Sequence, residues 1–341
     1  MDYIFFLRPF LLSLLITLLL CIFFIKSATL IKLSDFRSGI RHVHKEGISR
    51  LGGIAVIIGF FSAVFFDSRL VITQQLMGVV IGCLLILIIG IFDDLRQLSW
   101  KTQLLLQIFI AVIVLFFGVH LDYISNPLGG IISFSSQEGK ILGFLLVAVW
   151  IIFFMNALNW VDGIDGLSGG VTAIGAVTIF FLSMRAEVNQ PPVAIISVAV
   201  FGAMLAFLLL NFYPAKIMAG TSGSMFMGFI LAVLAIFAGA KIATTLLVMI
   251  VPIIDACWVI YQRFRSGKSI FLADKRHLHY RLMKLGLSQR KICMLYYIIT
   301  ALVAYAALNS STALKLEIFF LLAVVISFSL VIINKKTENE A

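Results

Sequence analysis

The sequence predicts an all-α, polytopic integral membrane protein that forms one transmembrane domain over residues 1–341. Of the 341 residues, 62% are hydrophobic and only 12% are charged, whereas a soluble domain is about half apolar and about a quarter charged. The apolar residues also form runs of about 17 to 25, the length that crosses a bilayer as a helix. These two observations exclude a soluble enzyme, a disordered regulator and a secreted disulfide scaffold.

Eleven apolar runs are expected to be membrane helices. In chain order they cover about 3–25, 51–66, 76–92, 103–119, 139–158, 167–184, 192–211, 223–238, 242–262, 293–309 and 315–333. The first run contains Arg8 and has no small-residue cleavage site, so it is expected to remain as a span rather than to be removed as a signal peptide.

The basic residues predict the orientation of these helices. With the N-terminus outside, twenty of the 26 Lys and Arg residues lie in the inner loops or the C-terminal tail. The positive-inside rule therefore predicts an N-out, C-in protein of the inner (plasma) membrane. The main inner loops are then 26–50, 93–102, 159–166, 212–222 and 263–292. The net charge of +10 follows from this topology and from anionic lipid, so no nucleic-acid partner is expected.

The acidic residues point to the same side. Seven of the ten Asp residues lie on the cytoplasmic face or are buried near it. Carboxylates at the ends of membrane helices are costly unless they have partners. We therefore expect several helix ends to face one water-filled cleft at the cytoplasmic face.

Two early segments could contribute to such a site. In RHVHKEGISRLGG at 41–53, the side chains of His44, Lys45 and Arg50 could hold a lipid phosphate, although an ordinary basic loop explains them nearly as well. In IFDD at 91–94, Asp93 and Asp94 offer the hard oxygen ligands that Mg²⁺ or Mn²⁺ prefers. The alternative is a simple polar stop after an apolar helix.

The segment NALNWVDGIDGLSGG at 156–170 is the most informative. Asn156, Asn159, Asp162 and Asp165 follow one another at three-residue spacing, which would place them on one face of a continuous helix. The neighbouring glycines make a continuous helix doubtful but allow a ligand to approach the backbone. Two amides and two carboxylates at this regular spacing suit a nucleotide or metal-phosphate site better than a polar loop without a binding function.

Two later segments could bind phosphate. In AGTSGSMFMGF at 219–229, Gly220 and Ser222 offer backbone N–H groups at the start of a helix. In ADKRHLHYRL at 273–282, His277 and His279 stand beside Arg276 and Arg281. This basic cluster suits an anionic phosphate better than a zinc ion, because two His side chains without a Cys are too few ligands for zinc. A solvated basic loop is the alternative.

Together, these segments resemble the polyprenyl-phosphate N-acetylhexosamine-1-phosphate transferase superfamily from about residue 35 to residue 286. The most specific part is NALNWVDGIDGL, followed by the DD pair and the basic His loop. HLHY at 277–280 is similar to the loop of the branch that loads GlcNAc-1-phosphate onto undecaprenyl phosphate.

The resemblance implies a reaction and a set of roles. A sugar phosphate, expected to be GlcNAc-1-phosphate, would pass from a UDP-N-acetylhexosamine to undecaprenyl phosphate, with release of UMP and with Mg²⁺ or Mn²⁺ as cofactor. This would be the first membrane step of a cell-envelope glycan. The implied catalytic residues are Asp93, Asp94, Asp162, Asp165, His277 and His279, and the implied metal ligands are Asp93, Asp94 and Asp165. The implied substrate-binding residues are His44, Lys45, Arg50, Asn156, Asn159, Gly220, Ser222, Arg276 and Arg281.

The sequence departs from the family pattern at several positions. Thr221 stands where the family usually has Asp, and Gln103 aligns with a usual Lys. A neutral hydroxyl is a much weaker Mg²⁺ ligand than a carboxylate. Three explanations stay open for Thr221: a metal site completed by Asp94 or Asp165, an inactive homologue, and an engineered substitution.

Two other functions compete with the transferase. A catalytically impaired homologue would bind lipid or nucleotide without turnover, as the departure at Thr221 suggests. A transporter is the weaker alternative, based on Asp255 beside Pro252 inside an apolar run, where a buried carboxylate could mark an ion path. The sequence leaves the exact sugar and the formation of a homodimer open.

Overall fold

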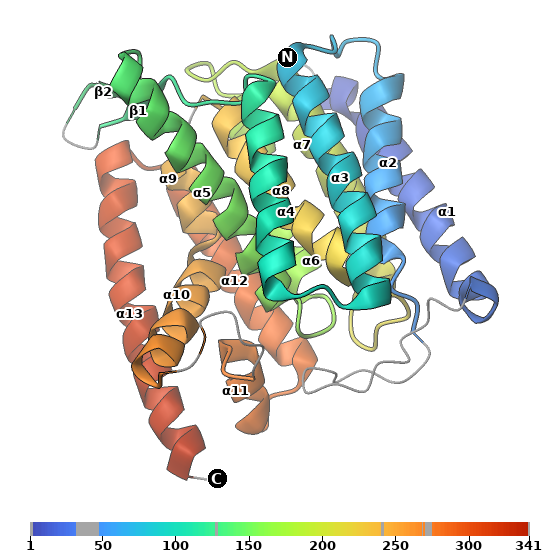
Figure 1. The fold of residues 1–341 in the computed structure, drawn as a ribbon, viewed down its shortest axis with the longest axis vertical. Helices are drawn as coiled ribbons and strands as arrows, with labels where there is room; N and C mark the ends of the chain where they lie inside the picture. Colours follow the sequence, from blue (N-terminus) through green and yellow to red (C-terminus); the bar gives the residue numbers. More distant parts are fainter. Residues whose placement is uncertain are drawn as a thin grey trace.

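The computed structural model describes residues 3–31, 48–126, 129–239, 242–267, 269 and 275–339. These residues form a bundle of helices that run up and down between two ends of the molecule (Figure 1). The N- and C-termini lie at opposite ends of this bundle.

The elements follow one another along the chain with connections of very different lengths. In chain order they are η1 (Tyr3–Phe6), α1 (Leu7–Ile31), α2 (Gly52–Phe66), α3 (Gln74–Arg96), α4 (Trp100–Phe116), β1 (Tyr123–Ser125), β2 (Ile131–Ser133), α5 (Gln137–Val161), α6 (Leu167–Ser183), α7 (Pro191–Asn211), α8 (Gly220–Phe237), α9 (Ile242–Val248), α10 (Ile250–Arg265), α11 (Leu278–Lys284), α12 (Gln289–Leu308) and α13 (Thr312–Asn339).

Each apolar run that was expected to cross the membrane is helical. Among the described residues, seven helices are long and apolar enough to span a bilayer, namely α1, α3, α5, α7, α8, α12 and α13. The pair α9 and α10 passes the same test together, while α2, α4 and α6 are shorter apolar helices. The expectation of a mostly helical, multi-pass membrane protein is therefore confirmed.

The expected helix over 242–262 is broken, which corrects one prediction. Helices α9 and α10 meet at an angle of 75°. The break has a local cause, because the proline ring of Pro252 excludes the carbonyl of the residue four positions earlier, Val248, where α9 ends. The bend turns α10 away from the direction of α9.

The fold is mostly all-α, as predicted, with one short pair of strands added to the helices. Strands β1 and β2 form an antiparallel hairpin in which Ile124 pairs with Ile132, next to the start of α5 (Figure 1). A further difference is helix α11, which forms inside the loop expected over 263–292.

Helices extend into each of the five expected inner loops, and two of these extensions place residues of the site. Helix α3 continues through Arg96, so Asp93 and Asp94 lie in its last turns rather than beyond its end. Helix α8 begins at Gly220, so Gly220 and Ser222 belong to its first turn.

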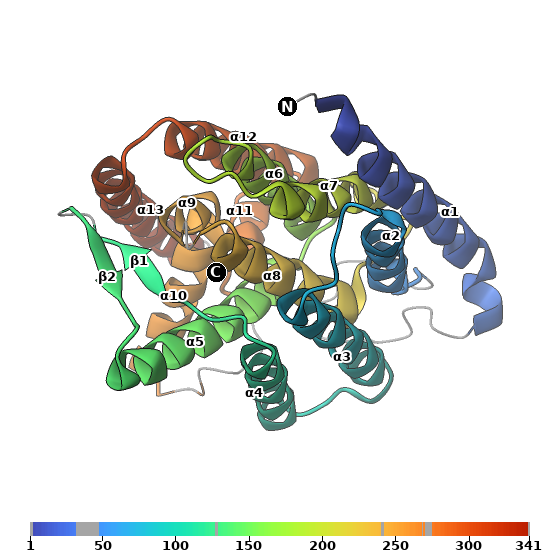
Figure 2. The same ribbon diagram turned by 90° about the horizontal axis from the view of Figure 1, so that it is seen from above.

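Helix α8 lies in the middle of the bundle, as the view from above shows (Figure 2), and packs against α2, α3, α5 and α6. Glycines allow this close approach. A Cβ atom at Gly90 of α3 would lie 2.3 Å from the Cα of Ser222, and one at Gly53 of α2 would lie 2.2 Å from the amide nitrogen of Gly223. The backbones of α2 and α3 therefore contact the first turn of α8 directly.

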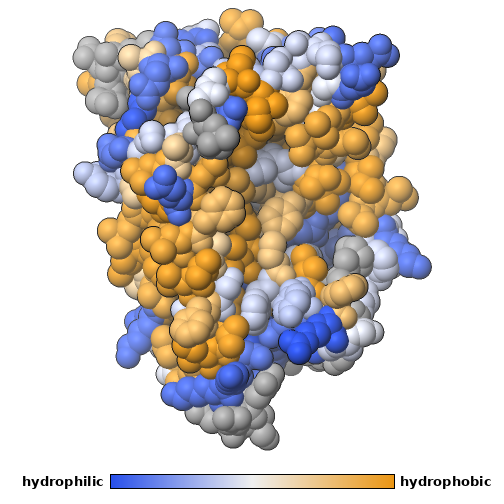
Figure 3. Space-filling view, turned by 90° about the vertical axis from the view of Figure 1, so that its left-hand side faces the viewer, coloured by the Kyte–Doolittle hydropathy of each residue, from blue (hydrophilic) through white to orange (hydrophobic). Residues whose placement is uncertain are grey.

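The surface fits a membrane environment. Figure 3 shows a broad band of hydrophobic side chains between two ends where hydrophilic side chains gather. Exposed large apolar residues are frequent on α13, α5 and α1, among them Phe328, Leu145 and Leu19. Such faces are stable when lipid covers them.

Candidate active site

The end of α3 holds a buried carboxylate that the fold keeps in place. Asp93 is 7% exposed. Its Oδ1 accepts hydrogen bonds from the backbone N–H of Leu98 at 2.9 Å and from Nε2 of Gln103 in α4 at 2.7 Å. The turn between α3 and α4 therefore fixes one side of this carboxylate.

Thr221, in the first turn of α8, lies between the two carboxylates of the DD pair. Its hydroxyl donates to Oδ2 of Asp93 at 2.7 Å, and its backbone N–H donates to Oδ2 of Asp94 at 2.9 Å. The first N–H groups of a helix have no partner within the helix, so an anion at this end is stabilised. The structure thus brings the DD pair to the N-terminus of α8.

Gly220 makes this approach sterically allowed. Its φ is +66°, in the left-handed region, and a Cβ atom there would lie 2.5 Å from Oδ2 of Asp94. Glycine is the residue that adopts such a backbone without strain.

Arg50 joins the same cluster through a short backbone pairing. Ser49 forms a parallel bridge with Ile217, and the N–H of Met218 donates to the carbonyl of Ser49 at 2.8 Å. This pairing places Nη1 of Arg50 3.3 Å from Oδ1 of Asp94. His44 and Lys45 of the same predicted segment lie outside the described residues.

Asn156 and Asn159 both lie on α5, where they contact different helices. Nδ2 of Asn156 donates to Oε1 of Gln107 in α4 at 2.6 Å. Nδ2 of Asn159 donates to the hydroxyl of Ser224 in α8 at 2.8 Å. Because that hydroxyl lies 3.3 Å from the carbonyl oxygen of Thr221, Asn159 is linked to the DD cluster through α8.

Asp162 and Asp165 leave this face because α5 ends at Val161. The hydroxyl of Ser168 in α6 donates to Asp162. Oδ2 of Asp165 accepts from the backbone N–H of Ala215 at 2.9 Å. The four regularly spaced polar residues thus have partners on four different segments.

The predicted His loop packs against the glycine turn after α5. A Cβ atom at Gly163 would lie 2.4 Å from Nε2 of His279 and 2.6 Å from the hydroxyl oxygen of Tyr280. The rings of His277 and His279 are nearly parallel, with centroids 5.8 Å apart, and the His277 centroid lies 6.1 Å from that of Trp160. Both His side chains are buried.

The two arginines of this loop have contacts within the protein. Nη1 of Arg276 lies 3.3 Å from the hydroxyl of Ser266. Arg281 is buried, and its guanidinium donates to Gln262 of α10 and to Asn334 of α13. Arg281 therefore ties α11 to two neighbouring helices, and its predicted contact with substrate stays a prediction.

The oxygen atoms around Thr221 suit a divalent cation. Asp93 and Asp94 provide carboxylate oxygens and Thr221 provides a hydroxyl, all hard ligands, and Mg²⁺ binds proteins through as few as one or two carboxylates. No group of three or more His, Cys, Asp or Glu side chains in the described part of the chain is placed to hold a metal. The predicted set of Asp93, Asp94 and Asp165 is therefore not assembled as one cluster, because Asp165 faces Ala215 instead.

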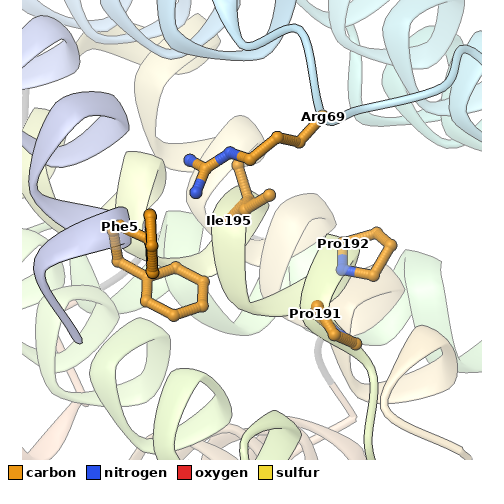
Figure 4. A pocket seen from close by; sticks show the side chains of 6 residues that line it. Phe5, Arg69, Pro191, Pro192 and Ile195 are labelled. Carbon is orange, nitrogen blue, oxygen red and sulfur yellow. The ribbon is translucent and has the colours of Figure 1, made fainter. Parts of the chain in front are cut away.

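A separate cavity lies at the other end of the molecule. It has a volume of about 270 Å³ and is lined by Phe5, Phe6, Arg69, Pro191, Pro192 and Ile195 (Figure 4). Arg69 precedes the start of α3, whereas Asp93 lies near the end of that helix. The cavity is mostly apolar and takes no part in the DD cluster.

Several residues of the site carried little signal in the sequence. Gln103, Gln107 and Ser224 are neutral residues in or beside apolar helices, and only the three-dimensional fold shows that they hold Asp93, Asn156 and Asn159. The sequence places Asp255 of α10 inside an apolar run, but no local pattern links it to the His loop that it contacts.

Known proteins resemble this chain over most of its length. The sequence profile of glycosyl transferase family 4 matches residues 76–239, from α3 to just after α8. A probable undecaprenyl-phosphate N-acetylglucosaminyl 1-phosphate transferase of Bacillus subtilis is 32% identical over 83% of this chain and 80% of its own. A decaprenyl-phosphate N-acetylglucosaminephosphotransferase of Mycobacterium tuberculosis is 34% identical over 79% of this chain and 74% of its own. A phospho-N-acetylmuramoyl-pentapeptide-transferase of Endomicrobium trichonymphae is 27% identical over 79% and 82%.

Proposed function

Because the chain belongs to glycosyl transferase family 4, among the polyprenyl-phosphate N-acetylhexosamine-1-phosphate transferases, we propose that it transfers GlcNAc-1-phosphate from UDP-GlcNAc to undecaprenyl phosphate. The products are undecaprenyl-diphosphate-GlcNAc and UMP. This reaction begins a cell-envelope glycan at the membrane. The relatives' names support a polyprenyl phosphate as acceptor and an N-acetylglucosamine phosphate as the transferred group.

One observation carries the proposal. Two carboxylates at the end of α3 meet the N-terminus of α8, and the 3.3 Å contact with Arg50 adds a positive charge to the same cluster. The cluster combines hard oxygen atoms, the N-terminus of a helix and a guanidinium, which are the groups that hold phosphates and their counterions.

The chemistry is a displacement at the β-phosphorus of the UDP-sugar. An oxygen of the lipid phosphate forms a new bond to this phosphorus, and the bond from the phosphorus to the oxygen that bridges the two phosphates breaks. The electron pair of the broken bond leaves with UMP. The lipid phosphate is largely ionised near pH 7, so the protein has less need of a general base than of positive groups that allow two anions to meet.

Mg²⁺ or Mn²⁺ bound by Asp93 and Asp94 would neutralise phosphate charge and favour the departure of UMP. Arg50 orients the phosphate groups next to this position. Asn159, held by Ser224, and Asn156, held by Gln107, orient the nucleotide on the face of α5.

The remaining proposed roles belong to the turn after α5 and to the His loop. Asp162 and Asp165 position the nucleotide and its phosphates, while His277, His279 and Arg276 contact the phosphates of the sugar nucleotide. The close contact of His279 with Gly163 supports the proposal that the turn and the loop act on one substrate.

The proposed topology has eleven spans, with the N-terminus outside the inner membrane and the active site facing the cytoplasm. The helical state of all eleven apolar runs supports it, as does the position of the termini at opposite ends of the bundle (Figure 1). An odd number of spans requires this separation.

A reconstituted assay tests the proposed function. The protein in nanodiscs is incubated with undecaprenyl phosphate, Mg²⁺ and one of a panel of UDP-N-acetylhexosamines, and UMP and the lipid product are measured by mass spectrometry. We expect both products with UDP-GlcNAc and none from an Asp93→Asn, Asp94→Asn double variant. No product with any donor would overturn the proposal.

A specific observation also keeps a second candidate open, a catalytically impaired homologue. The two oxygens of Asp93 accept from neutral donors, Gln103 and Thr221, where the family pattern has a Lys and an Asp. Such a protein would bind UDP-GlcNAc or lipid phosphate without releasing UMP. Binding of UDP-GlcNAc measured by calorimetry, together with an absence of turnover, would identify it.

A further inference from the structure

We propose that Asp255 of α10 is a positioning residue for His277, because it fixes the tautomer of the imidazole and leaves Nε2 as the ring atom that meets a substrate phosphate. The role of His277 toward phosphate rests on the proposed function. The assignment of its tautomer rests on the structure alone.

Asp255 is a carboxylate inside an apolar helix, and its side chain is fully buried. A charge in this position is strongly unfavourable unless it has partners. Both of its oxygens have one at the start of α11. Oδ2 lies 2.9 Å from Nδ1 of His277, and Oδ1 accepts the backbone N–H of Leu278 at 2.8 Å.

These two contacts determine which nitrogen of His277 carries hydrogen. A carboxylate accepts hydrogen bonds and cannot donate them, so Nδ1 of His277 must be the N–H donor. The tautomer of a histidine is set in this way by the partner of one ring nitrogen. The neutral ring therefore has its lone pair at Nε2, and this atom alone can gain or lose a proton while the contact with Asp255 persists.

Nε2 of His277 is the atom left for a ligand. It is buried and has no hydrogen-bond partner among the described residues. The His277 ring lies near two other rings, that of His279, whose centroid is 5.8 Å away, and that of Trp160, whose centroid is 6.1 Å away. The guanidinium of Arg263 lies 5.9 Å from the centre of the Trp160 ring. When Nε2 takes up a proton, its N–H donates to a phosphate oxygen and the charge of Asp255 balances the imidazolium.

The variant Asp255→Asn separates positioning from packing, because Asn has nearly the same shape. The N–H of Leu278 is always a donor, so the amide oxygen of Asn must face it. The amide NH₂ group then points at Nδ1 of His277 and donates to it, which moves the ring hydrogen to Nε2 and prevents the imidazolium from forming. An Asp-to-Asn change beside a catalytic histidine acts through the wrong tautomer in the same way.

The first test measures tautomers and needs no turnover. Protein labelled with ¹⁵N-histidine is studied in nanodiscs near pH 8 by long-range ¹⁵N–¹H correlation, and the His277 signals are assigned from their loss in His277→Gln. We expect the Nδ1–H form in the wild type and the Nε2–H form in Asp255→Asn. The same tautomer in both proteins would overturn the inference.

The second test measures turnover of UDP-GlcNAc and undecaprenyl phosphate. We expect kcat to fall about 10²-fold in Asp255→Asn and in His277→Gln. We expect the kcat of the double variant to lie within about twofold of the kcat of the less active single variant. Losses that multiply in the double variant would show that Asp255 acts independently of His277 and would overturn the inference. Asp67→Asn, a buried carboxylate at the other end of the bundle, is the matched control and should retain wild-type kcat.

The two tests separate the failure of this inference from the failure of the proposed function. A wild-type protein that yields no UMP with any UDP-sugar contradicts the transferase activity, while the tautomer measurement still decides whether Asp255 positions His277.

Discussion

At the scale of single residues, Thr221 holds together two carboxylates that would otherwise repel each other. Its hydroxyl and its backbone N–H each bind one member of the DD pair. Hydroxyl groups are good hydrogen-bond donors and weak ligands for Mg²⁺. The DD pair of this chain is therefore held by hydrogen bonds even without a cation.

The change Thr221→Asp is expected to make the protein depend more strongly on a divalent cation. A third carboxylate beside Asp93 adds a ligand and raises Mg²⁺ affinity by about tenfold or more, and with it Mg²⁺-dependent turnover. Without the cation the added charge lowers the melting temperature. UMP release and thermal melting with and without EDTA measure both effects.

Thr221→Asn is the control for this prediction because it has the size of Asp without the charge. Equal or lower turnover in a folded Thr221→Asp protein would count against position 221 as a ligand position.

A single methyl group at Gly163 should displace the His loop. Gly163→Ala places a Cβ atom 2.4 Å from Nε2 of His279, so the ring must move away from the turn after α5. We expect a loss of kcat of at least about tenfold, since small displacements of catalytic groups are costly. Gly175→Ala in α6, where the new Cβ meets the flexible end of Leu231 at 3.1 Å and a methyl group of Val248 at 3.5 Å, should keep normal kcat.

The sequence did not predict the partners of the expected site residues. The three-residue spacing from Asn156 to Asp165 suggested one polar face, but α5 ends at Val161 and the two Asp residues leave the helix. Asp255 was recognised as a costly buried charge, yet its partner His277 is 22 residues away. Such partners depend on how α10 and α11 pack, which no local pattern encodes.

At the scale of elements, the crossing of α3 and α8 sets the distance between the DD pair and Thr221. Helix α3 contacts the first turn of α8 at Gly90, where a Cβ atom would lie 2.3 Å from the Cα and the amide nitrogen of Ser222. The contacting atoms are largely backbone, so side-chain movement alone cannot relieve the overlap.

Gly90→Ala should therefore separate the two helices. We expect a destabilisation of about 1–3 kcal/mol, as for other overpacked interiors, together with reduced turnover, because Asp93 moves away from Thr221. Thermal melting in detergent and the UMP assay measure the two effects. A variant with normal stability and normal kcat would show that the crossing does not need this close contact.

The turn between α2 and α3 should be sensitive to pH. Hydrogen bonds from Arg69 hold the pKa of Asp67 below its usual value. A lowered folded-state pKa stabilises the protein above the unfolded pKa of about 3.9, and this stabilisation is lost as the pH falls through the lower folded value.

Asp67→Asn should accordingly lower the melting temperature at pH 7, where the ion pair contributes about 1 kcal/mol or less. The difference from the wild type should shrink as the pH falls below about 4. A difference that is the same at pH 7 and pH 3 would contradict an ionic contribution from Asp67.

Hydrophobicity located the helices well but not their ends. The core of every apolar run is helical because lipid leaves the backbone no other way to satisfy its hydrogen bonds. The ends depend on caps and side-chain partners. Helix α3 continues to Arg96, past its acidic pair. Gln97, in the left-handed conformation, caps the end of this helix by donating its backbone N–H to the carbonyl of Asp93. The run over 242–262 was expected as one helix although it contains Pro252, and a proline in the interior of a helix breaks or kinks it.

At the scale of the whole molecule, the proposed topology can be tested by chemical labelling. In a Cys257→Ser background, which removes the exposed native thiol, we expect Ser135→Cys to react with a membrane-impermeant maleimide in intact cells. Gln97→Cys should react only after permeabilisation, because the loop between α3 and α4 faces the cytoplasm in this topology. Both positions are exposed in the structure, and the reverse pattern would contradict the N-out orientation.

The parallel bridge between Ser49 and Ile217 has a consequence for the biogenesis of the protein. The segment before α2 and the segment before α8 complete one cluster, and Thr221 is synthesised 128 residues after Asp93. At ribosomal rates of about 5–20 residues per second, this interval is roughly ten seconds. During that time α3 is in the membrane while its acidic pair still lacks Thr221, so a chain that stalls before α8 would expose an incomplete polar end to membrane quality-control proteases.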